Sequence, residues 1–430
     1  MTKEKTIFFY TLGCRLNQAE TAILQNIAVK EGFMISEAGD AAEVVVVNTC
    51  TVTEKSDVDT RRLVSKIIRG NPRARIALIG CQAQTQKEKL LQLPQVRWVV
   101  GNARKFDLFD IIAQTDTEKS PVVITPDIPG DDFQIPLAGI PRSKTRANLK
   151  IQDGCDFFCS YCEVPYARGR ARSRYFADIL REAKILVQAG HKELILTGVN
   201  IGLYNDNGQR IAEVVTALES IPGLERIRIS SIEPGTIPWA LIEKMPSPNK
   251  LCRYLHIPLQ SGSNEILKSM GRKYSADEFI GFIREVHQKV KDICIGTDII
   301  VGFPGETETH FQETLAVLRK SPINYFHVFS YSKRHLAKSR HFHGEVAGDI
   351  IRRRSQILRD LSQVKRREYW KSLIGTCPRV LFEEKKGGGW RGLTDHYIRV
   401  QAESNKDLRN HLVRVELQGI DGQMMTGKII

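Results

Sequence analysis

The chain has 430 residues, and its 63 Lys and Arg against 49 Asp and Glu give a net charge of +14. This length is too great for one ordinary core and predicts two or three domains, while 42% hydrophobic and 26% charged residues exclude a largely disordered chain. The excess of positive charge favours a polyanionic partner such as nucleic acid, against the alternative of a protein that is merely basic.

No apolar run approaches the ~20 residues that a membrane-spanning helix needs, so we expect no membrane partner. The apolar stretch near the amino terminus is short and is typical of a first strand, not of a signal peptide. We therefore expect a cytoplasmic protein. Thiols stay reduced there, so the nine cysteines are better interpreted as metal ligands or buried small residues than as disulfides.

Residues 1–115 alternate between short apolar strands and amphipathic helices, which predicts an α/β, doubly wound domain with a parallel sheet. The segments KTIFFYTLGC, AEVVVVNTC and ARIALIGC each end in a cysteine, at Cys14, Cys50 and Cys81. Ligands bind at the carboxyl edge of such sheets. We therefore expect these three thiols to converge, the alternative being three unrelated core cysteines.

Residues 116–146 carry five prolines and no clear period, which predicts a linker. From 147 to 370 six strand candidates alternate with helical segments, which predicts a partial (β/α)6 barrel with its site at the carboxyl ends of the strands. A basic amphipathic helix closes this domain. Residues 371–430 alternate in short segments with Gly-rich turns, which predicts a small antiparallel β-barrel.

Cys155, Cys159 and Cys162 follow the first strand of the predicted barrel with the spacing C-x3-C-x2-C. Zinc usually takes two pairs of Cys or His ligands, and no such second pair is nearby. Three thiolates instead fit a [4Fe–4S] cluster with one iron left to a ligand that is not protein. A zinc loop or buried cysteines remain the alternatives.

This motif, with Tyr161 before its last cysteine, resembles the radical S-adenosylmethionine superfamily, in which S-adenosylmethionine binds the open iron. The segments TLGCRLNQAE, NTCTVT, GCQAQ, KIQDGC, PYARG, HIPLQSGS and GTDIIVGFPGET resemble the methylthiotransferases over essentially the whole chain. The residues of these segments are most similar to those of the branch that acts on threonylcarbamoyladenosine in tRNA. Sister branches act on isopentenyladenosine in tRNA or on an aspartate of a ribosomal protein.

The resemblance implies two [4Fe–4S] clusters, the second one held by Cys14, Cys50 and Cys81, and S-adenosylmethionine as both methyl donor and radical source. It implies 2-methylthiolation of adenosine 37, with an electron donor such as flavodoxin or ferredoxin. The alternatives are the isopentenyladenosine reaction, a zinc-containing RNA-binding protein without catalysis, and a second cluster that only relays electrons. The implied cofactor-binding residues lie at strand ends; they are Thr197, Gly198, Asn200, Gln260, Ser261, Asp298, Val301 and Gly302.

One group of basic residues directly follows the cluster loop, and a second group directly follows the last strand of the barrel. We expect them to grip the phosphates of a tRNA anticodon stem-loop, with an aromatic side chain stacked on an unpaired base; the alternative is a solvated charged face. These residues are Tyr166, Arg168, Arg170, Arg172, Arg174, Lys333 and Arg334. The terminal barrel resembles the TRAM module, and its EEKKGGGWRG hairpin is a second expected RNA contact.

Two features depart from the family pattern. Glu163 stands where an aliphatic residue is common, and the stretch HLAKSRHFHG at 335–344 replaces a Pro-Gly-Thr-like segment. A solvated basic loop is the preferred interpretation of this stretch over a histidine metal site. We expect either departure to alter substrate fit or rate.

Overall fold

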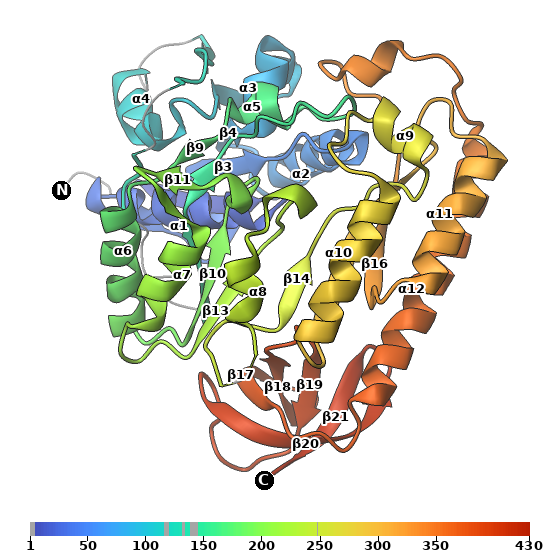
Figure 1. The fold of residues 1–430 in the computed structure, drawn as a ribbon. Helices are drawn as coiled ribbons and strands as arrows, with labels where there is room; N and C mark the ends of the chain where they lie inside the picture. Colours follow the sequence, from blue (N-terminus) through green and yellow to red (C-terminus); the bar gives the residue numbers. More distant parts are fainter. Residues whose placement is uncertain (1–4, 116–119, 131–133, 138–144, 247) are drawn as a thin grey trace.

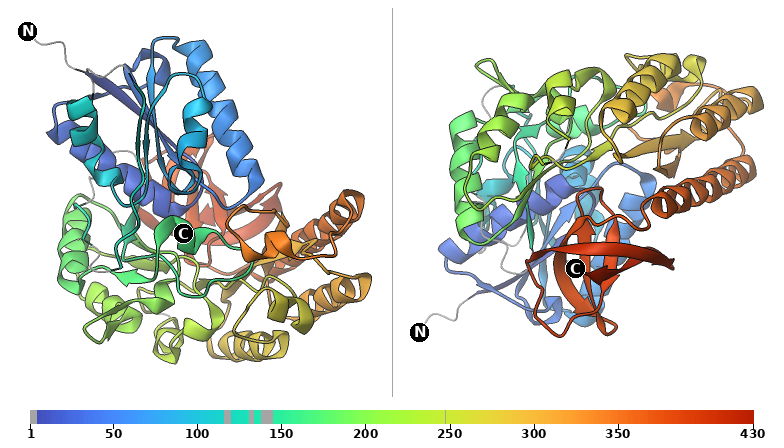
Figure 2. Two further views of the ribbon diagram at one scale, coloured as in Figure 1. Left: turned by 90° about the horizontal axis from the view of Figure 1, so that it is seen from above. Right: turned by 60° about the horizontal axis from the view of Figure 1, so that its bottom comes forward.

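The computed structural model describes residues 5–115, 120–130, 134–137, 145–246 and 248–430. In chain order it shows a parallel-sheet domain, an arc of six strands covered by helices, and a closed barrel at the carboxyl end (Figure 1). The amino-terminal domain and the closed barrel lie on neighbouring sides of the arc (Figure 2).

The amino-terminal domain is one sheet of six parallel strands in the order β2-β1-β3-β4-β5-β6. Its central strand β3 is buried along its whole length because the run of four valines has helices on both sides. The strands are β1 (Thr6–Thr11), β2 (Met34–Ile35), β3 (Val44–Thr49), β4 (Arg75–Gly80), β5 (Val96–Val100) and β6 (Val122–Ile124).

Separate apolar clusters on the two faces of this sheet confirm the prediction of an α/β domain with a parallel sheet. Its helices are α1 (Arg15–Lys30), α2 (Glu54–Gly70), α3 (Cys81–Gln86) and α4 (Leu108–Thr115). The short strand β6 lies in the stretch that was expected to be a linker. It joins the edge of the sheet because three consecutive β-branched residues pair with β5.

The second domain has two parallel three-stranded sheets, β7-β10-β13 and β14-β15-β16. A parallel bridge between Ser231 and His256 joins them into one arc, and no ladder in the described chain closes the arc from β16 back to β7. Helix α1 of the first domain packs against β7. The strands are β7 (Arg146–Lys150), β10 (Glu193–Thr197), β13 (Arg226–Ile229), β14 (Tyr254–His256), β15 (Cys294–Val301) and β16 (Tyr325–Ser330).

Helices on the convex side of the arc bury the largest apolar cluster of the protein. Between β7 and α6 the chain forms the short pair β8 (Gln152–Asp153) and β9 (Arg172–Ser173) around α5 (Val164–Arg168), and a second pair, β11 (Asn205–Asp206) and β12 (Gln209–Arg210), precedes α7. The helices are α6 (Phe176–Gln188), α7 (Ile211–Glu219), α8 (Trp239–Glu243), α9 (Asn264–Ser269), α10 (Ala276–Lys289), α11 (Glu308–Lys320) and α12 (Gly348–Ser372).

The carboxyl-terminal strands form a closed barrel in the order β17-β18-β19-β21-β20. The expectation of an entirely antiparallel barrel is wrong for one pair: β19 and β21 are parallel, because this pairing closes the barrel between strands that are not consecutive. The strands are β17 (Arg379–Lys386), β18 (Gly389–Thr394), β19 (Arg399–Ala402), β20 (Leu412–Asp421) and β21 (Met424–Ile429).

This barrel is firmly docked on the arc. Its apolar core continues into Tyr254, Tyr325 and Trp370, and the buried guanidinium of Arg228 on β13 donates to the backbone carbonyls of Thr394 and Asp395. Within the described residues, no helix has both the length and the apolar character that crossing a membrane requires.

Candidate active site: two cysteine triads and a cationic cavity

Cys14, Cys50 and Cys81 come directly after β1, β3 and β4, which are neighbours in the sheet, so their thiols converge at its carboxyl edge. Gly13 has φ +91°, and a Cβ there would collide with the side chain of Cys50, so only glycine lets these two turns approach so closely. Burial and the nearby Cys81 and Cys14 raise the pKa of Cys50 to about 11. We call this set the amino-terminal triad.

Cys155, Cys159 and Cys162 lie in the loop between β8 and α5, and we call them the barrel triad. The amide of Cys162 donates to the carbonyl of Cys159 (3.0 Å), which folds the loop back on itself. Burial, with Cys159 nearby, raises the pKa of the Cys155 thiol to about 11, and the pKa of Cys162 is raised further for the same reasons. Deprotonating these buried thiols therefore costs free energy. A cationic metal centre would offset this cost because it binds and stabilises the thiolate form.

The spacing of the sulfurs distinguishes between kinds of metal centre. All six cysteines are in the described chain, and in neither triad do the three Sγ atoms all approach within 4.8 Å of one another. A single zinc ion with Zn–S bonds of ~2.3 Å draws its sulfurs to roughly 3.8 Å apart. An iron–sulfur cluster spaces its thiolates more widely because each binds a different iron. Neither triad is therefore drawn together as a single zinc ion requires, and both are compatible with the wider spacing of a cluster.

A buried network of charges joins the amino-terminal triad to the domain that carries the barrel triad. Arg168, which follows the barrel triad, donates from Nε to Sγ of Cys81 (3.2 Å) and from Nη1 to Glu20 (2.8 Å) and Asp153 (2.9 Å). Burial alone would raise the pKa of Glu20, but Arg168 and two lysines hold it well below its usual range. Arg168 thus binds the barrel domain to the amino-terminal domain beside Cys81.

The structure corrects the expected RNA role of three arginines. Arg168, Arg174 and Arg334 are buried, and carboxylates neutralise them: Glu20 and Asp153 for Arg168, Glu182 for Arg174, and Glu163 and Asp57 for Arg334. They are therefore closed to phosphate.

The other residues of the expected RNA grip differ in exposure. Arg170 and Lys333 are exposed, each with an acidic partner at the surface, and Arg172 is largely covered. Tyr166 is partly exposed, with its ring against Phe158. In the expected carboxyl-terminal hairpin, Trp390 is buried and cannot stack on a base.

The residues expected to bind the cofactor divide into two groups. Thr197 and Gly198 line the large cavity described below, and the amides of Val199 and Asn200 beside them donate to Oε1 of Gln152. Asn200 is buried, and its Nδ2 lacks a hydrogen-bond partner among the described residues, so it retains a free donor.

The second group packs away from this cavity. The hydroxyl of Ser261 contacts Thr314 on α11, Val301 is buried, and a Cβ on Gly302 would meet Ile351 of α12. Gln260 is held by its backbone between Asp298 and Ile300. Their predicted contacts with a cofactor therefore remain predictions.

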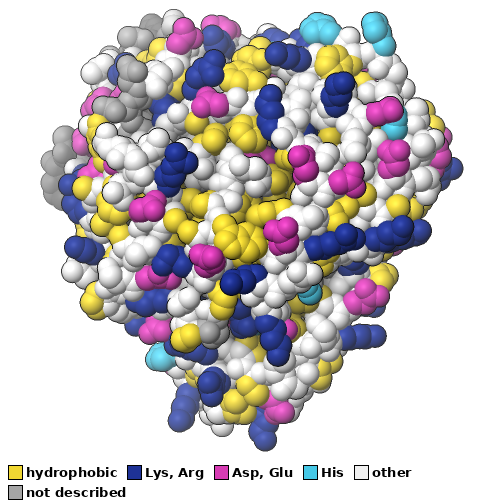
Figure 3. Space-filling view, viewed as in Figure 1, with side chains coloured by type: hydrophobic (Ala, Val, Ile, Leu, Met, Phe, Trp, Pro, Cys, Tyr) yellow, Lys and Arg dark blue, Asp and Glu magenta, His cyan; other side chains and the backbone are white. Residues whose placement is uncertain are grey.

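A cavity of about 730 Å³ lies between the inner side of the arc, α1, α12 and the carboxyl-terminal barrel. Cys14 of the amino-terminal triad is on its wall, together with Thr197 and Gly198. No Asp or Glu of the described chain lines it, whereas four arginines do: Arg15, Arg366, Arg391 and Arg399. The cavity is therefore cationic. The face shown in Figure 3 instead mixes basic and acidic side chains.

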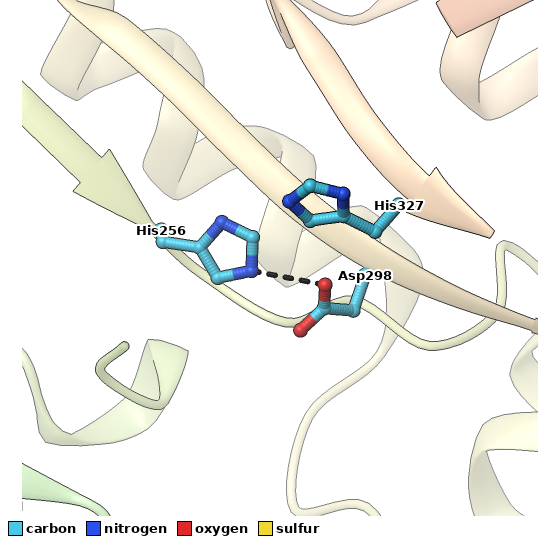
Figure 4. A group of neighbouring side chains, drawn as sticks. All are labelled: His256, Asp298 and His327. Carbon is cyan, nitrogen blue, oxygen red and sulfur yellow. Dashed lines mark ion pairs between the residues drawn. The ribbon is translucent and has the colours of Figure 1, made fainter. Parts of the chain in front are cut away.

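Aromatic and imidazole rings form the inner wall of this cavity. His256 on β14, Asp298 on β15 and His327 on β16 lie side by side, with Nε2 of His256 3.0 Å from Oδ1 of Asp298 (Figure 4). Two imidazoles and a carboxylate can bind a divalent cation. Burial and His256 lower the pKa of His327, however, and Arg366 contributes to the same effect. Asp298 acts in the opposite direction, but the positive charge of Arg366 also opposes a bound cation.

Sequence reasoning missed this wall and the four arginines, since none of them stands in a motif. The wall residues have one signal in the sequence, the alternation of strand residues in YLH and YFH. This alternation turns Tyr254, His256, Tyr325 and His327 to the same face of the arc.

Comparison with known proteins agrees with this architecture. Residues 149–318 match the model of the radical SAM superfamily, and residues 6–101 match the uncharacterized protein family UPF0004. The chain is 36% identical to the threonylcarbamoyladenosine tRNA methylthiotransferase MtaB of Aquifex aeolicus, over 95% of this chain and 99% of that protein. It is 34% identical to MtaB of Bacillus subtilis, over 96% and 93%.

The chain is also 32% identical, over 100% of its length and 99% of that protein, to a tRNA-2-methylthio-N(6)-dimethylallyladenosine synthase of Cereibacter sphaeroides. Among solved structures, the radical S-adenosylmethionine methyltransferase TsrM of Kitasatospora setae shares the fold, with a TM-score of 0.55 and 16% identity over 76% of this chain and 73% of that one. The fold and the two triads define a radical SAM enzyme. Within that superfamily, the chain belongs to the tRNA methylthiotransferase family.

Proposed function

We propose that this enzyme methylthiolates carbon 2 of N6-threonylcarbamoyladenosine at position 37 of tRNA, with two [4Fe–4S] clusters and two molecules of S-adenosylmethionine. When bound, the cluster at the barrel triad and S-adenosylmethionine supply a 5′-deoxyadenosyl radical, a second S-adenosylmethionine supplies the methyl group, and the cluster at the amino-terminal triad supplies the sulfur. A radical is needed because carbon 2 bears an unactivated C–H bond that side-chain acids and bases cannot remove.

The observation that carries the proposal is that Arg168, which follows the barrel triad, contacts the amino-terminal triad, while Cys14 of that triad lies on the wall of the cationic cavity. The guanidinium contacts Cys81 of one triad and lies six residues after Cys162 of the other. Two cofactors held this way can act on one base without the base leaving the site.

The charge of the cavity favours threonylcarbamoyladenosine over isopentenyladenosine. The threonylcarbamoyl group carries a carboxylate, and the isopentenyl group is a hydrocarbon. Four arginines and no described acidic residue line the cavity. An apolar group placed there would desolvate the guanidinium groups without compensating their charge.

The anticodon stem-loop would approach over Tyr166, Arg170 and Lys333, and the carboxyl-terminal barrel, which is similar to a TRAM module, would add a second contact. Phosphate contacts of this kind position the RNA without reading its sequence. A small redox protein such as flavodoxin or ferredoxin would supply the electrons, and the cytoplasm would be the compartment.

Analysis of tRNA nucleosides from a deletion strain tests the reaction directly. Loss of the 2-methylthio derivative of threonylcarbamoyladenosine is expected, while loss of the isopentenyl derivative would favour the sister reaction. Iron and sulfide should be present in the anaerobically purified protein, and a colourless zinc-loaded protein would support the non-catalytic alternative.

A Cys50→Ala variant, with Cys252→Ala as a control outside both triads, tests the role of the second cluster. It should keep the cleavage of S-adenosylmethionine and lose the methylthio product. Loss of cleavage as well would instead support an electron relay.

A further inference from the structure

We propose that Arg366, assisted by Arg391 and Arg15, binds the carboxylate of the substituent on the target base and so selects bases with an acidic substituent. This inference rests on the proposed function and deepens it. It concerns which residues read the substrate, a role to which no sequence motif of this chain points.

The first observation is that the cavity arginines lack, among the described residues, the carboxylate partner that the buried arginines have: Arg15, Arg366 and Arg391 are partly buried and Arg399 is exposed. Elsewhere each guanidinium meets a carboxylate: Arg228 meets Glu193, and Arg354 meets Glu306. Across the described residues, no carboxylate lies within ion-pair distance of the four arginines that line the cavity, and none lines the cavity with them. Partly desolvated positive charge of this kind is stabilised when a ligand brings the anion.

Arg366 is the best placed of the four. It lies on α12 with its Cζ 5.1 Å from the ring centroid of Tyr325, whose hydroxyl is fixed by Tyr254 (2.7 Å). Stacking of this kind orients the plane of the guanidinium but uses none of its N–H donors. Its charge reaches the cavity wall, where it contributes to the lowered pKa of His327.

Two further arginines are held by neutral partners. Arg391 on β18 donates from Nε to Oε1 of Gln401 (3.1 Å), and Arg15 donates from Nη2 to the hydroxyl of Tyr397 (2.6 Å) while stacking on that ring. Both groups are therefore oriented without being neutralised. A carboxylate that entered the cavity could accept a bidentate pair of hydrogen bonds from one of them or from Arg366.

The carboxylate of the base substituent is a better match than a backbone phosphate. The cavity wall includes Cys14, which in the proposed function belongs to the triad whose cluster supplies sulfur to the reacting base. A substituent on that base enters the cavity with it, whereas the phosphates of a flipped nucleotide stay at the rim.

The test compares anticodon stem-loop RNAs whose adenosine 37 is unmodified, bears threonylcarbamoyl, or bears the threonylcarbamoyl methyl ester. The reconstituted full-length enzyme should bind the acid more tightly than the neutral ester. Arg366→Met should weaken binding of the acid by at least about tenfold and leave the other two RNAs unchanged. Arg367→Met, on the exposed side of the same helix, is the matched control.

The circular dichroism spectrum and the midpoint of urea unfolding of Arg366→Met should match those of the wild type, which shows that the variant is folded. Equal weakening of all three RNAs would mean a phosphate contact and would overturn the inference, as would equal affinity of the wild-type enzyme for acid and ester. If the wild-type enzyme binds the acid preferentially but forms no methylthio product, the proposed function fails and the inference stands.

Discussion

The carboxylate of Glu163 lies 3.0 Å from Nε of Arg334, and both side chains are buried. Thr51 of the amino-terminal domain donates to the same carboxylate (2.8 Å), and so does the amide of Leu336 (2.8 Å). The two departures from the family pattern, Glu163 and the stretch 335–344, are therefore parts of one contact. This contact joins the cluster loop, the first domain and the segment after β16.

Removing Glu163 should loosen this joint. Glu163→Leu leaves Arg334 buried with only Asp57 as its acidic partner, so we expect a loss of about 2–3 kcal/mol in the free energy of unfolding, measured with urea. Lys333→Ala, which breaks an exposed ion pair, should cost less than about 1 kcal/mol. A Glu163→Leu protein as stable as the wild type would refute the structural role of the pair.

Arg168→Lys should disturb the environment of the amino-terminal triad, because an ammonium group cannot reach Cys81, Glu20 and Asn17 together. We expect a changed electron paramagnetic resonance signal of one cluster and, where that cluster is lost, a fall of the iron content by roughly half. Arg170→Lys, two residues further on at the surface, is the control and should preserve both. Identical spectra for the two variants would contradict the assignment.

Gly154 should resist substitution. This residue directly precedes the first cysteine of the barrel triad. It has φ +73°, and a Cβ there would collide with the carbonyl oxygen of Arg170. Gly154→Ala should therefore lose the barrel cluster, with a corresponding loss of absorption near ~400 nm from iron–sulfur charge transfer. Gly281→Ala, on α10 with open space around its Cα, should keep the full absorption. Full cluster content in Gly154→Ala would mean that the loop can shift.

The docking of the carboxyl-terminal barrel should weaken in acid. Burial lowers the pKa of His396 from 6.5 to about 4, although the carboxylate of Asp395, 3.4 Å from its Nδ1, acts in the opposite direction. Between these values the unfolded chain binds the proton and the folded chain does not. Stability therefore falls as pH falls from about 6.5 to about 4, by about 3 kcal/mol in total.

A titration of urea unfolding between pH 7 and pH 5 checks this prediction. His396→Gln should flatten the dependence on pH, and His411→Gln, at an exposed position of the same barrel, should leave it as in the wild type. An unchanged slope in His396→Gln would place the acid-labile group elsewhere.

The parallel sheets could be predicted from the sequence because their signal is local. The valine run of β3 and the cysteines after β1, β3 and β4 follow from strand periodicity and from the rule that parallel strands share a carboxyl edge. The order of the strands in the closed barrel could not be read in this way, since the β19–β21 pair depends on closure of the whole sheet.

The burial and the partners of charged side chains were harder to predict than the strands. Arg168 and Arg170 look alike in the sequence, but one is buried against Glu20, 148 residues away, and the other is at the surface. Only the tertiary structure supplies the carboxylate that distinguishes them. The cavity arginines likewise come from four separate elements, and no local pattern connects them.

The contact between Arg15 and Tyr397 spans 382 residues, so the first helix and the last barrel wall the same chamber. During synthesis on the ribosome, the six cysteines of the two triads emerge long before the final strands that wall this chamber. A chain cut short before β18 would lack Arg391, Arg399 and the Tyr397 that holds Arg15, so this side of the chamber would stand open to solvent.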